Sequence, residues 1–439
     1  MYKEEKMISD SSRKKRGYKK KYTRKNRKGK IGGAAFSAGG YGCVFKPALT
    51  CANNIKNKNI KKKIGTVSKL LEKRNAFDEM QEIERVLKYI KRNPDNSKYF
   101  IINDQVSICT PAPLKKADLK NYGKICSGTK LDSLGITQKN INAHLDELNI
   151  INMVDGGEDL DNMWDTLVPG RKKNKKFNAD MFNNINTHLI ALLNNAIIKL
   201  NQEGLYHFDI KGSNILVGKD KNTRLIDWGT SFEFNNEHNH SSIPVKVYNR
   251  AIFQYNVPFS VILFVEGLEK IIANFIKNKN IGNLNKKNQL NLVKEIAEKI
   301  ILHNLKENGS GHLELILEKM IIAYRDVLGN KNFTTEKAML MIRDYLADIL
   351  FNYLDFNTFI FDLNTYFIQV FLHNIDIYGF LTAYIELIMP DKTNKDYFHL
   401  VQEISKVLND FCWSALYASK PISLQKLTDR LNELNIGGY

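Results

Sequence analysis

Two aspartates and an asparagine lie close together near the middle of the sequence. Asp209 and Asn214 are five positions apart in the run YHFDIKGSN (206–214), and Asp227 follows thirteen residues after Asn214. One carboxylate can orient a hydroxyl group, while an amide oxygen and a second carboxylate can hold a metal ion against phosphate groups. The set therefore indicates chemistry on a magnesium-bound nucleotide.

Apolar residues around these polar groups indicate the elements that position them. The runs 215–217 and 225–226 are apolar and flank the turn-forming residues 218–222, which predicts two short buried strands joined by a turn. The polar groups then lie on loops at the strand ends. An apolar stripe through residues 179–203, ended by Gly204, predicts an amphipathic helix that leads into the run.

A glycine-rich stretch, FSAGGYGCVFKP (36–47), predicts a strand, a tight turn and a second strand. Glycines let the backbone approach phosphate oxygens and offer N–H donors without obstruction by side chains. The candidate nucleotide-binding residues in this stretch are Ser37, Gly39, Gly40, Gly42 and Val44.

A lysine and a glutamate are candidates for a buried ion pair. In the predicted strand VSKL (67–70), the side chain of Lys69 points away from those of its neighbours, which suits a lysine that reaches phosphates. The alternative is a surface lysine on an edge strand. Residues 74–92 have a helical apolar stripe, and Glu79 falls inside it. Because a carboxylate on a buried face needs a cation, Glu79 is the predicted partner of Lys69, with Glu82 as the alternative.

Composition excludes several classes of protein. Five scattered cysteines without a CxxC motif make a disulfide framework or a zinc site the disfavoured interpretation and suggest a reducing compartment. The first residues contain no apolar segment of the kind found in secretion signals, so secretion is not expected. The most apolar run, 257–275, contains three charged residues, so it predicts a buried helix and no membrane span. His238 and His240 have no further ligands at suitable spacing, which favours a flexible polar loop over 230–247 and no metal site.

Positive charge is concentrated in the first 31 residues. They carry fourteen Lys and Arg residues against three acidic ones, and so about eleven of the eighteen net positive charges. This segment is predicted to be disordered. It is either an arm that binds nucleic acid or carries a nuclear-targeting signal, or a solvated tail without a dedicated partner.

These motifs together resemble the eukaryotic-type protein kinases, and more narrowly the divergent serine/threonine kinases of large DNA viruses. The likeness rests on GGYGCVFKP (39–47), SKL (68–70) and DIKGSN (209–214); it covers residues 36 to about 230 well and 373–420 weakly. It implies ATP and Mg²⁺ or Mn²⁺ as ligands. The implied roles are contact with the α- and β-phosphates for Lys69, acceptance of the substrate hydroxyl proton for Asp209, and metal binding for Asn214 and Asp227.

The resemblance also implies roles for residues outside that set. Lys211 stands where serine/threonine kinases place a lysine that contacts the transferred phosphate. Met153 and Val154 end a strand that resembles the kinase hinge, whose backbone holds the adenine. Asp376 begins a run, DIYGFL (376–381), that resembles the helix whose aspartate ties the catalytic loop to the rest of the fold.

Two departures from the family pattern change the expectations. Phe208 stands where many kinases have an arginine that pairs with a phosphorylated activation loop, so activity is expected to be independent of such phosphorylation. No Ala-Pro-Glu follows Asp227, and about 145 residues separate its loop from Asp376, which implies a large helical insertion.

The predicted fold is therefore α+β: a bilobal protein-kinase-like fold with a β-rich N-lobe, a helical C-lobe and a large helical insertion after the metal-binding loop. The expected parts are a basic tail (1–31), an N-lobe (32–155), the catalytic part of the C-lobe (156–235), the insertion with the activation segment (236–372) and closing helices (373–439).

The predicted function is an ATP-dependent protein kinase that phosphorylates Ser or Thr in a protein substrate. One alternative is a small-molecule phosphotransferase of related fold. Another is a pseudokinase scaffold whose basic tail binds nucleic acid; this would be expected to lack Lys69, Asp209, Asn214 or Asp227, and all four are present. The expected location is the cytoplasm or nucleus of a host cell, or a virion.

Overall fold

The structure, a computed structural model, combines an antiparallel sheet with a large set of helices in an α+β fold. It describes residues 33–54, 65–102, 106–170, 176–235, 242–277, 279 and 285–437. The basic tail 1–31, together with His238 and His240, lies outside the described residues, so the predictions made for them stay predictions.

The main sheet has five strands in the order β1-β2-β3-β5-β4, and every neighbouring pair is antiparallel. Its strands are β1 (Ala34–Ala38), β2 (Gly42–Lys46), β3 (Thr66–Glu72), β4 (Ser107–Cys109) and β5 (Leu148–Val154). The remaining strands, in two small sheets, are β6 (Glu158–Asp159), β7 (Leu205–Tyr206), β8 (Ile215–Val217), β9 (Thr223–Leu225) and β10 (Phe232–Glu233). The pair β8–β9 confirms the two short strands predicted on either side of the turn 218–222.

Of the described α-helices, three precede β5, and the others follow it. They are α1 (Lys73–Arg92), α2 (Tyr122–Ile125), α3 (Lys130–Ser133), α4 (Leu160–Leu167), α5 (Ala179–Leu192), α6 (Ile198–Gln202), α7 (Val245–Tyr248), α8 (Leu268–Lys277), α9 (Lys286–Glu307), α10 (Leu313–Ile321), α11 (Thr335–Tyr353), α12 (Leu363–Tyr366), α13 (Leu372–Thr382), α14 (Lys395–Leu408) and α15 (Leu424–Asn432). Helix α1 and the run α5–α6, joined by a π-helical turn, confirm the helices predicted over 74–92 and 179–203.

The main sheet has two faces with different roles, because side chains alternate along each strand. Val44, Lys69 and Ile151 are directly opposite one another on β2, β3 and β5, so they share one face. Ile151 on this face belongs to the same hydrophobic core as α1. Leu70 and Ile150 lie on the other face and belong to a second, smaller core. The face that carries Lys69 is therefore the one turned toward α1.

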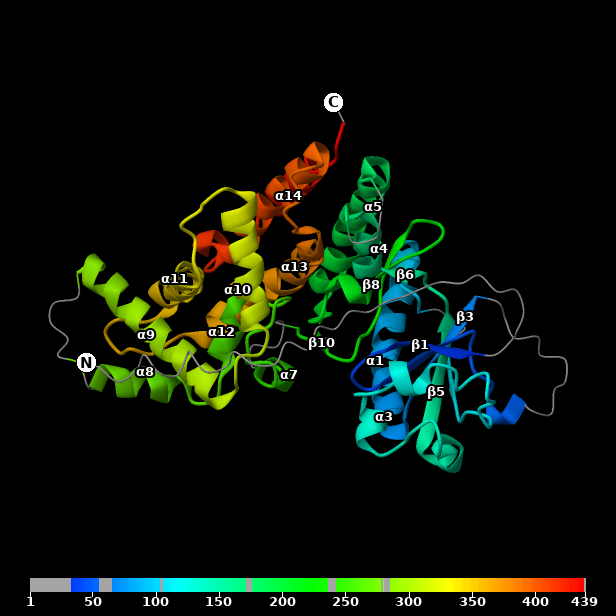
Figure 1. The fold of residues 1–439 in the computed structure, drawn as a ribbon. Coiled ribbons are helices and arrows are strands. Elements are labelled where there is room, and N and C mark those ends of the chain that lie inside the picture. The colour runs from blue at the N-terminus through cyan, green and yellow to red at the C-terminus, as the bar shows by residue number, and fades with distance from the viewer. Residues whose placement is uncertain are drawn as a thin grey trace.

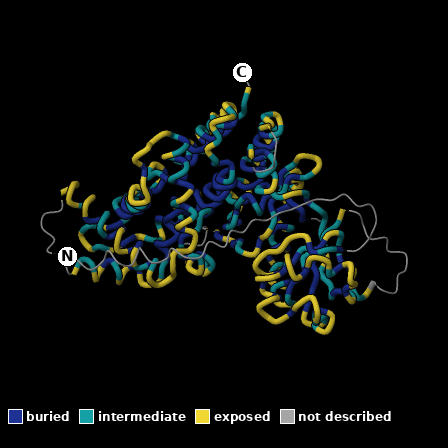
Figure 2. The backbone as a smooth tube through the Cα atoms, viewed as in Figure 1, coloured by how far each residue is buried: buried dark blue, intermediate teal, exposed yellow. Residues whose placement is uncertain are grey.

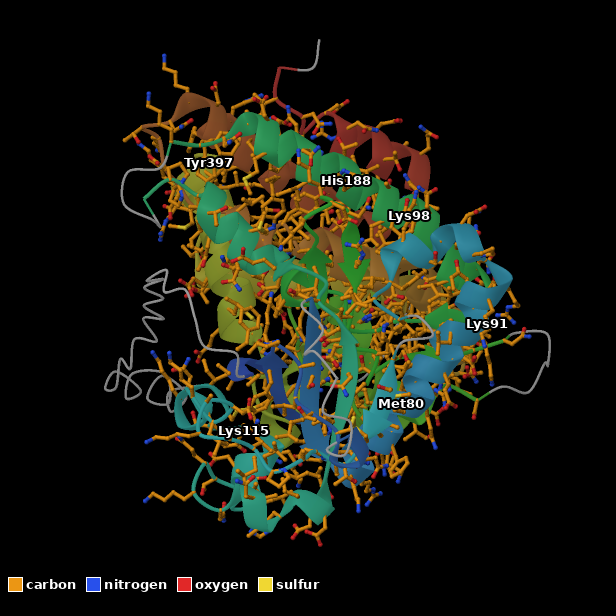
Figure 3. The ribbon with its side chains drawn as sticks, turned by 90° about the vertical axis from the view of Figure 1, so that its right-hand side faces the viewer. Met80, Lys91, Lys98, Lys115, His188 and Tyr397 are labelled. Carbon is orange, nitrogen blue, oxygen red and sulfur yellow. A yellow bond between two sulfur atoms is a disulfide. The ribbon has the colours of Figure 1, made fainter. Side chains whose placement is uncertain are left out.

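Residues 110–147, with α2 and α3, cover the second face of the sheet. Leu131 and Ile136 of this segment are buried with Phe45 of β2 in the smaller core. Figure 3 places Lys115 of the segment and Met80 of α1 on opposite sides of the strands. The sheet is therefore enclosed between α1 and this covering segment.

Two disulfides fasten the covering segment and its neighbours to the sheet. Cys43 of β2 is bonded to Cys126, 83 residues later, and Cys51 is bonded to Cys109 of β4. The expectation that the scattered cysteines form no disulfide framework is therefore wrong. The cysteines are far apart in sequence, and only the pairing of the strands and the covering segment brings them together.

The helical part surrounds one large core that also holds the buried residues of the polar run at 206–214. This core takes residues from α1, from α4 to α15, and from the loop that carries Phe208. Helix α12, a π-helical turn and α13 form one continuous helical run from Leu363 to Thr382. In Figure 1 the helices α8, α9 and α11 lie at the end of the molecule away from the sheet, α13 lies in the middle, and Figure 2 shows buried positions running through the helical part.

Two further expectations differ from the structure. The run 257–275 is not one helix: a 3₁₀-helix covers Phe259–Phe264, and Gly267, with φ +79°, precedes α8. A left-handed glycine does not continue a helix. Residues 230–247 are not all loop, because β10 pairs with β7 and α7 begins at Val245. Among the described helices, no segment is both long and apolar enough to cross a bilayer.

The disulfides generate a stability prediction. The Cys43→Ser/Cys126→Ser variant should be less stable than the wild type by about 2–4 kcal/mol, because the bond closes a long loop in the unfolded chain. Urea unfolding with and without reductant measures this, and reductant should lower the stability of the wild type more than that of the variant. Equal unfolding curves for all four samples would contradict the assignment of this disulfide.

Candidate active site

Asp209 is surrounded by four side-chain donors. Its Oδ2 accepts hydrogen bonds from Lys211 Nζ at 2.8 Å and Asn214 Nδ2 at 3.0 Å. Its Oδ1 accepts from Arg250 Nη2 at 3.0 Å and Asn256 Nδ2 at 2.9 Å. Two of these donors come from the run 206–214 itself, and two come from the segment after α7. The carboxylate is thereby held in one orientation.

The charges around Asp209 also determine its protonation. Burial would raise the pKa of this carboxyl group, but Arg250 and Lys211 outweigh burial and hold the pKa below its ordinary value. Asp209 is therefore a carboxylate at neutral pH. A carboxylate of low pKa is a weak proton acceptor but a good hydrogen-bond acceptor, which suits it to orient a hydroxyl group.

The loop that carries Asp209 is anchored from behind by Asp376 on α13. The two carboxylate oxygens of Asp376 accept hydrogen bonds from the backbone N–H groups of His207 and Phe208, each at 2.8 Å. Phe208 has φ +62°, a conformation that residues other than glycine rarely adopt. The structure thus places Asp376 where the family resemblance implies, on the backbone of a strained loop.

Asn214 and Asp227 lie next to each other because two short strands pair behind them. Asn214 Nδ2 also donates to the carbonyl of Asp209 at 2.8 Å, which turns the amide oxygen away from Asp209. The carbonyl of Asn214 accepts from the N–H of Ile226 at 3.1 Å, so Asp227 follows directly. An amide oxygen and a carboxylate are suitable ligands for Mg²⁺, which usually takes one or two protein ligands together with phosphate oxygens and water.

Trp228 is the buried support behind Asp227. Its ring centroid lies 4.5 Å from that of His207 and 5.8 Å from that of Phe100. Its indole Nε1 has no hydrogen-bond partner among the residues that the structure describes. Trp164, in contrast, donates its Nε1–H to the carbonyl of Ala383 at 2.8 Å.

Lys69 is held by two carboxylates from distant parts of the chain. Its Nζ lies 2.8 Å from Glu79 Oε1, 2.7 Å from Glu79 Oε2 and 3.5 Å from Asp227 Oδ1. Burial would lower the pKa of Lys69, but Glu79 and Asp227 outweigh burial and raise the pKa. The ammonium group therefore stays charged, on the face of the sheet shared with Val44.

Glu82 has a different set of partners, so Glu79 and not Glu82 pairs with Lys69. Glu82 is buried, although the helical pattern placed it beside the apolar stripe. Its Oε1 accepts from Lys246 Nζ at 2.8 Å, and its Oε2 accepts from Ser231 Oγ at 3.1 Å and Arg85 Nη1 at 2.7 Å.

The glycine-rich turn, residues 39–41, joins β1 to β2 at the end of the strand pair. The N–H of Gly39 donates to the carbonyl of Gly42 at 3.0 Å and closes the turn, and the carbonyl of Gly40 accepts from the N–H of Lys130 at 2.8 Å. A Cβ at Gly39 or Gly40 would meet nothing within 4 Å, so space is open beside both. A Cβ at Gly42 would lie 2.2 Å from the carbonyl of Leu70, so Gly42 is required by strand packing. Ser37 is paired with Val44 across the same hairpin.

The predicted hinge residues lie at the end of β5. Met153 is opposite Val67 and Val154 is opposite Thr66, two and three residues before Lys69 on the neighbouring strand. The chain then passes through Gly157, where a Cβ would lie 2.0 Å from the carbonyl of Val217. Met153 therefore shares the face of the sheet that carries Lys69 and Val44.

Sequence reasoning missed the basic and polar residues in and directly after α7. Arg250, Asn256 and Lys246 contact Asp209 or Glu82, and none of them belongs to a motif that the sequence analysis used. The buried carboxylates were a signal that cations must lie nearby. Because the chain has 65 Lys and Arg residues, that signal does not identify which of them are the partners of the buried carboxylates.

No other part of the described chain offers a comparable set of groups. Among these residues, no three His, Cys, Asp or Glu side chains gather closely enough to hold a metal ion by themselves. A cavity of about 1070 Å³ between α8 and α9 is lined by lysines, His303 and apolar groups, and it shares no residue with the set around Asp209.

Asp161, at the start of α4, lies against the back of the loop that carries Asp209. A Cβ at Gly212 would come within 1.9 Å of Asp161 Oδ1, so a side chain there would have to displace the Asp161 carboxylate. Burial, and then Glu386, Asp159 and Asp165, raise the pKa of Asp161 to about 7, while Lys211 opposes the shift.

Comparison with known proteins adds no relative: no family model matches the chain, and no curated protein matches it.

Trp228 generates a prediction with Trp164 as its control. Both Trp→Phe variants lose the same buried ring volume, so both should lower the free energy of unfolding. Trp164→Phe should lower it by about 1 kcal/mol more than Trp228→Phe, because it also leaves the carbonyl of Ala383 without its donor, whereas Trp228 loses an N–H that has no acceptor. Chemical denaturation measures both, and an equal loss in the two variants would contradict the described environment of Trp228.

Asp161 generates a pH prediction. Its folded-state pKa is raised, so the folded protein keeps a proton that the unfolded chain releases, and its contribution to stability falls as pH rises from about 4 to about 7. Asp161→Asn should therefore gain up to about 4 kcal/mol over the wild type between pH 4 and pH 8, the equivalent of about three pKa units. Denaturation of both proteins at the two pH values measures the gain. A stability difference that does not change with pH would contradict the raised pKa.

Proposed function

We propose that the protein is an ATP-dependent protein kinase that transfers the γ-phosphate to Ser or Thr hydroxyl groups. The observation that carries the proposal is the position of Lys69, whose ammonium group contacts Glu79 of α1 and Asp227 of the loop after β9. Three segments separated by up to 158 residues meet at this cation, and a lysine between two carboxylates beside the glycine-rich turn is a combination of residue types suited to phosphate and metal binding.

The arrangement of elements supports a bilobal protein-kinase-like architecture for the same reason. A five-stranded antiparallel sheet with α1 on one face presents Lys69, Val44 and the glycine-rich turn together. The loop with Asp209 and the loop with Asp227 come from the helical part. A nucleotide held between the two would have its phosphates beside Lys69 and its base beside Met153 and Val154.

Each residue then has a physical role. The open backbone at Gly39 and Gly40 offers N–H donors to phosphate oxygens, and Lys69 supplies a fixed positive charge. Asp209 orients the attacking hydroxyl through a carboxylate that is already held by four donors. Lys211, 2.8 Å from Asp209, provides a cation where the transferred group would acquire charge.

The metal has a defined place in this proposal. Asn214 and Asp227 are the residues that would hold Mg²⁺, and their amide oxygen and carboxylate fit its preference for oxygen ligands. The bound metal would neutralise charge on the phosphate oxygens during transfer.

The two alternatives differ from this proposal in the molecule that accepts the phosphoryl group and in whether any phosphoryl group is transferred. A small-molecule phosphotransferase would label a soluble hydroxyl compound and no protein. A pseudokinase scaffold would bind nucleotide or nucleic acid and transfer nothing. The retention of Asp209, Lys211 and Asn214 in one hydrogen-bonded cluster favours turnover.

The direct test is phosphoryl transfer from labelled ATP. Purified protein with Mg²⁺ or Mn²⁺ should label a basic or mixed protein substrate on Ser or Thr, and a chelator should abolish the labelling. Asp209→Asn should reduce transfer by at least about 100-fold, the range lost when a positioned acid–base group is removed. Asp227→Ala should also abolish most of the transfer, because the metal would lose its carboxylate ligand.

Asp220→Asn is the matched control. Asp220 lies in the turn between β8 and β9, where it pairs with Arg224 away from the site, so this variant should keep full activity. Equal labelling by the wild type, Asp209→Asn and Asp227→Ala would rule out the proposal, and labelling of small hydroxyl compounds alone would favour the phosphotransferase.

A further inference from the structure

The short segment around α7 contacts three elements whose relative positions matter for the proposed reaction. Lys246 lies within α7, and Arg250 follows four residues later. Their side chains contact helix α1, the loop after Asp227 and the loop that carries Asp209. None of these elements is adjacent to α7 in the sequence.

Lys246 fixes α1 to the loop that follows Asp227. Its Nζ donates to Glu82 Oε1 at 2.8 Å, to the carbonyl of Ser231 at 2.6 Å and to the carbonyl of Gly229 at 3.3 Å. Glu82 lies three residues after Glu79 on α1, so the two carboxylates are neighbours on the helix surface. A contact that holds Glu82 therefore also determines where Glu79 meets Lys69.

Arg250 fixes the loop that carries Asp209. Its guanidinium group donates to the carbonyl of Phe208 and to Asp209 Oδ1, the latter at 3.0 Å. The guanidinium carbon lies 4.7 Å from the centre of the Phe208 ring, a cation–π arrangement. Arg250 thus holds the side chain and the carbonyl of a residue whose φ is in the left-handed region, directly before Asp209.

The segment around α7 is itself held by buried packing and by hydrogen bonds. Val247 is fully buried in the large core. The carbonyl of Ala251 accepts hydrogen bonds from Asn304 Nδ2 at 2.6 Å and Asn308 Nδ2 at 3.2 Å, both from the last turn of α9 and its end. The segment that carries the two cations is therefore hydrogen-bonded to the end of α9.

We propose that Lys246 and Arg250 are positioning residues that assemble this site with unmodified side chains. The inference rests on the proposed kinase function and deepens it. Lys246 holds the Lys69–Glu79 pair through α1, and Arg250 holds Asp209 through the backbone and ring of Phe208.

The consequence is a site whose assembly needs no added phosphate. In this protein the charged contacts between α1, the loop after Asp227 and the loop with Asp209 are made by a lysine, an arginine and carboxylates of the chain. The helical segment after residue 242 thereby acquires a role as the support that carries these two cations.

The test compares charge-removing and charge-keeping variants of dephosphorylated protein. Phosphatase-treated wild type, shown by intact mass to carry no phosphate, should keep its full transfer rate. Lys246→Met should raise the KM for ATP, because the Lys69–Glu79 pair loses its support. Arg250→Met should lower kcat with little change in the KM for ATP, because Asp209 is misplaced. Each change should be at least about tenfold, or about 1.4 kcal/mol.

Conservative and coupled variants distinguish positioning from general stability. Lys246→Arg should restore most of the affinity for ATP. In a Glu82→Gln background, Lys246→Met should have little further effect. Lys306→Met and Arg325→Met, exposed cations whose partners are the adjacent Glu307 and Asp326, should behave as wild type. Thermal melting of every variant identifies any that is unfolded.

The outcomes separate the inference from the proposed function. Active wild type with unaffected Lys246→Met and Arg250→Met variants overturns the inference and leaves the kinase function standing. Loss of wild-type activity on phosphatase treatment also overturns the inference alone. Absence of transfer by untreated wild type, with every substrate class and both metals, overturns both.

Discussion

The position of one ammonium group determines most of the site. Lys69 Nζ is largely buried on the face of the sheet between Glu79 and Asp227, and a buried lysine without carboxylates would lose its charge. The two carboxylates keep it charged, and they can reach it only if α1 lies on the sheet and the loop after β9 faces it. The ion pair therefore couples the packing of α1 to the placement of Asp227, the aspartate proposed to bind the metal.

The same coupling extends outward through further buried charges. Lys246 holds Glu82 and so joins α1 to the helical part, and Arg250 holds Asp209 within the helical part. Removal of one member of such a pair leaves the other charge buried and uncompensated, which costs more than the pair contributes. This explains why the elements around the site have to fold together. It also explains why an otherwise ordinary helical segment after residue 242 matters to the proposed chemistry.

The periodicity of apolar residues within single elements predicted those elements and the Lys69–Glu79 pair. It could not predict contacts between residues far apart in the sequence. The apolar stripe of α1 singled out Glu79, and the alternation in β3 singled out Lys69, because both signals lie within one element. Cys43 and Cys126 are 83 residues apart, and Arg250 reaches Asp209 across 41 residues, so neither contact leaves a periodic signal. Glu82 was placed beside the stripe, since helical geometry alone does not reveal that α7 packs against that side. Likewise, the break at Gly267 was hidden by an apolar run that continues on both sides of it.

The central claim is that Lys69, Asn214 and Asp227 form one site for a metal-bound nucleotide. The measurement that tests it most directly is a crystal structure of the protein with Mg²⁺ and a non-hydrolysable ATP analogue. The account predicts phosphate oxygens within hydrogen-bonding distance of Lys69 Nζ and a metal ion held by the Asn214 amide oxygen and the Asp227 carboxylate. An analogue bound in the cavity between α8 and α9, with no ligand density beside Lys69, would contradict it.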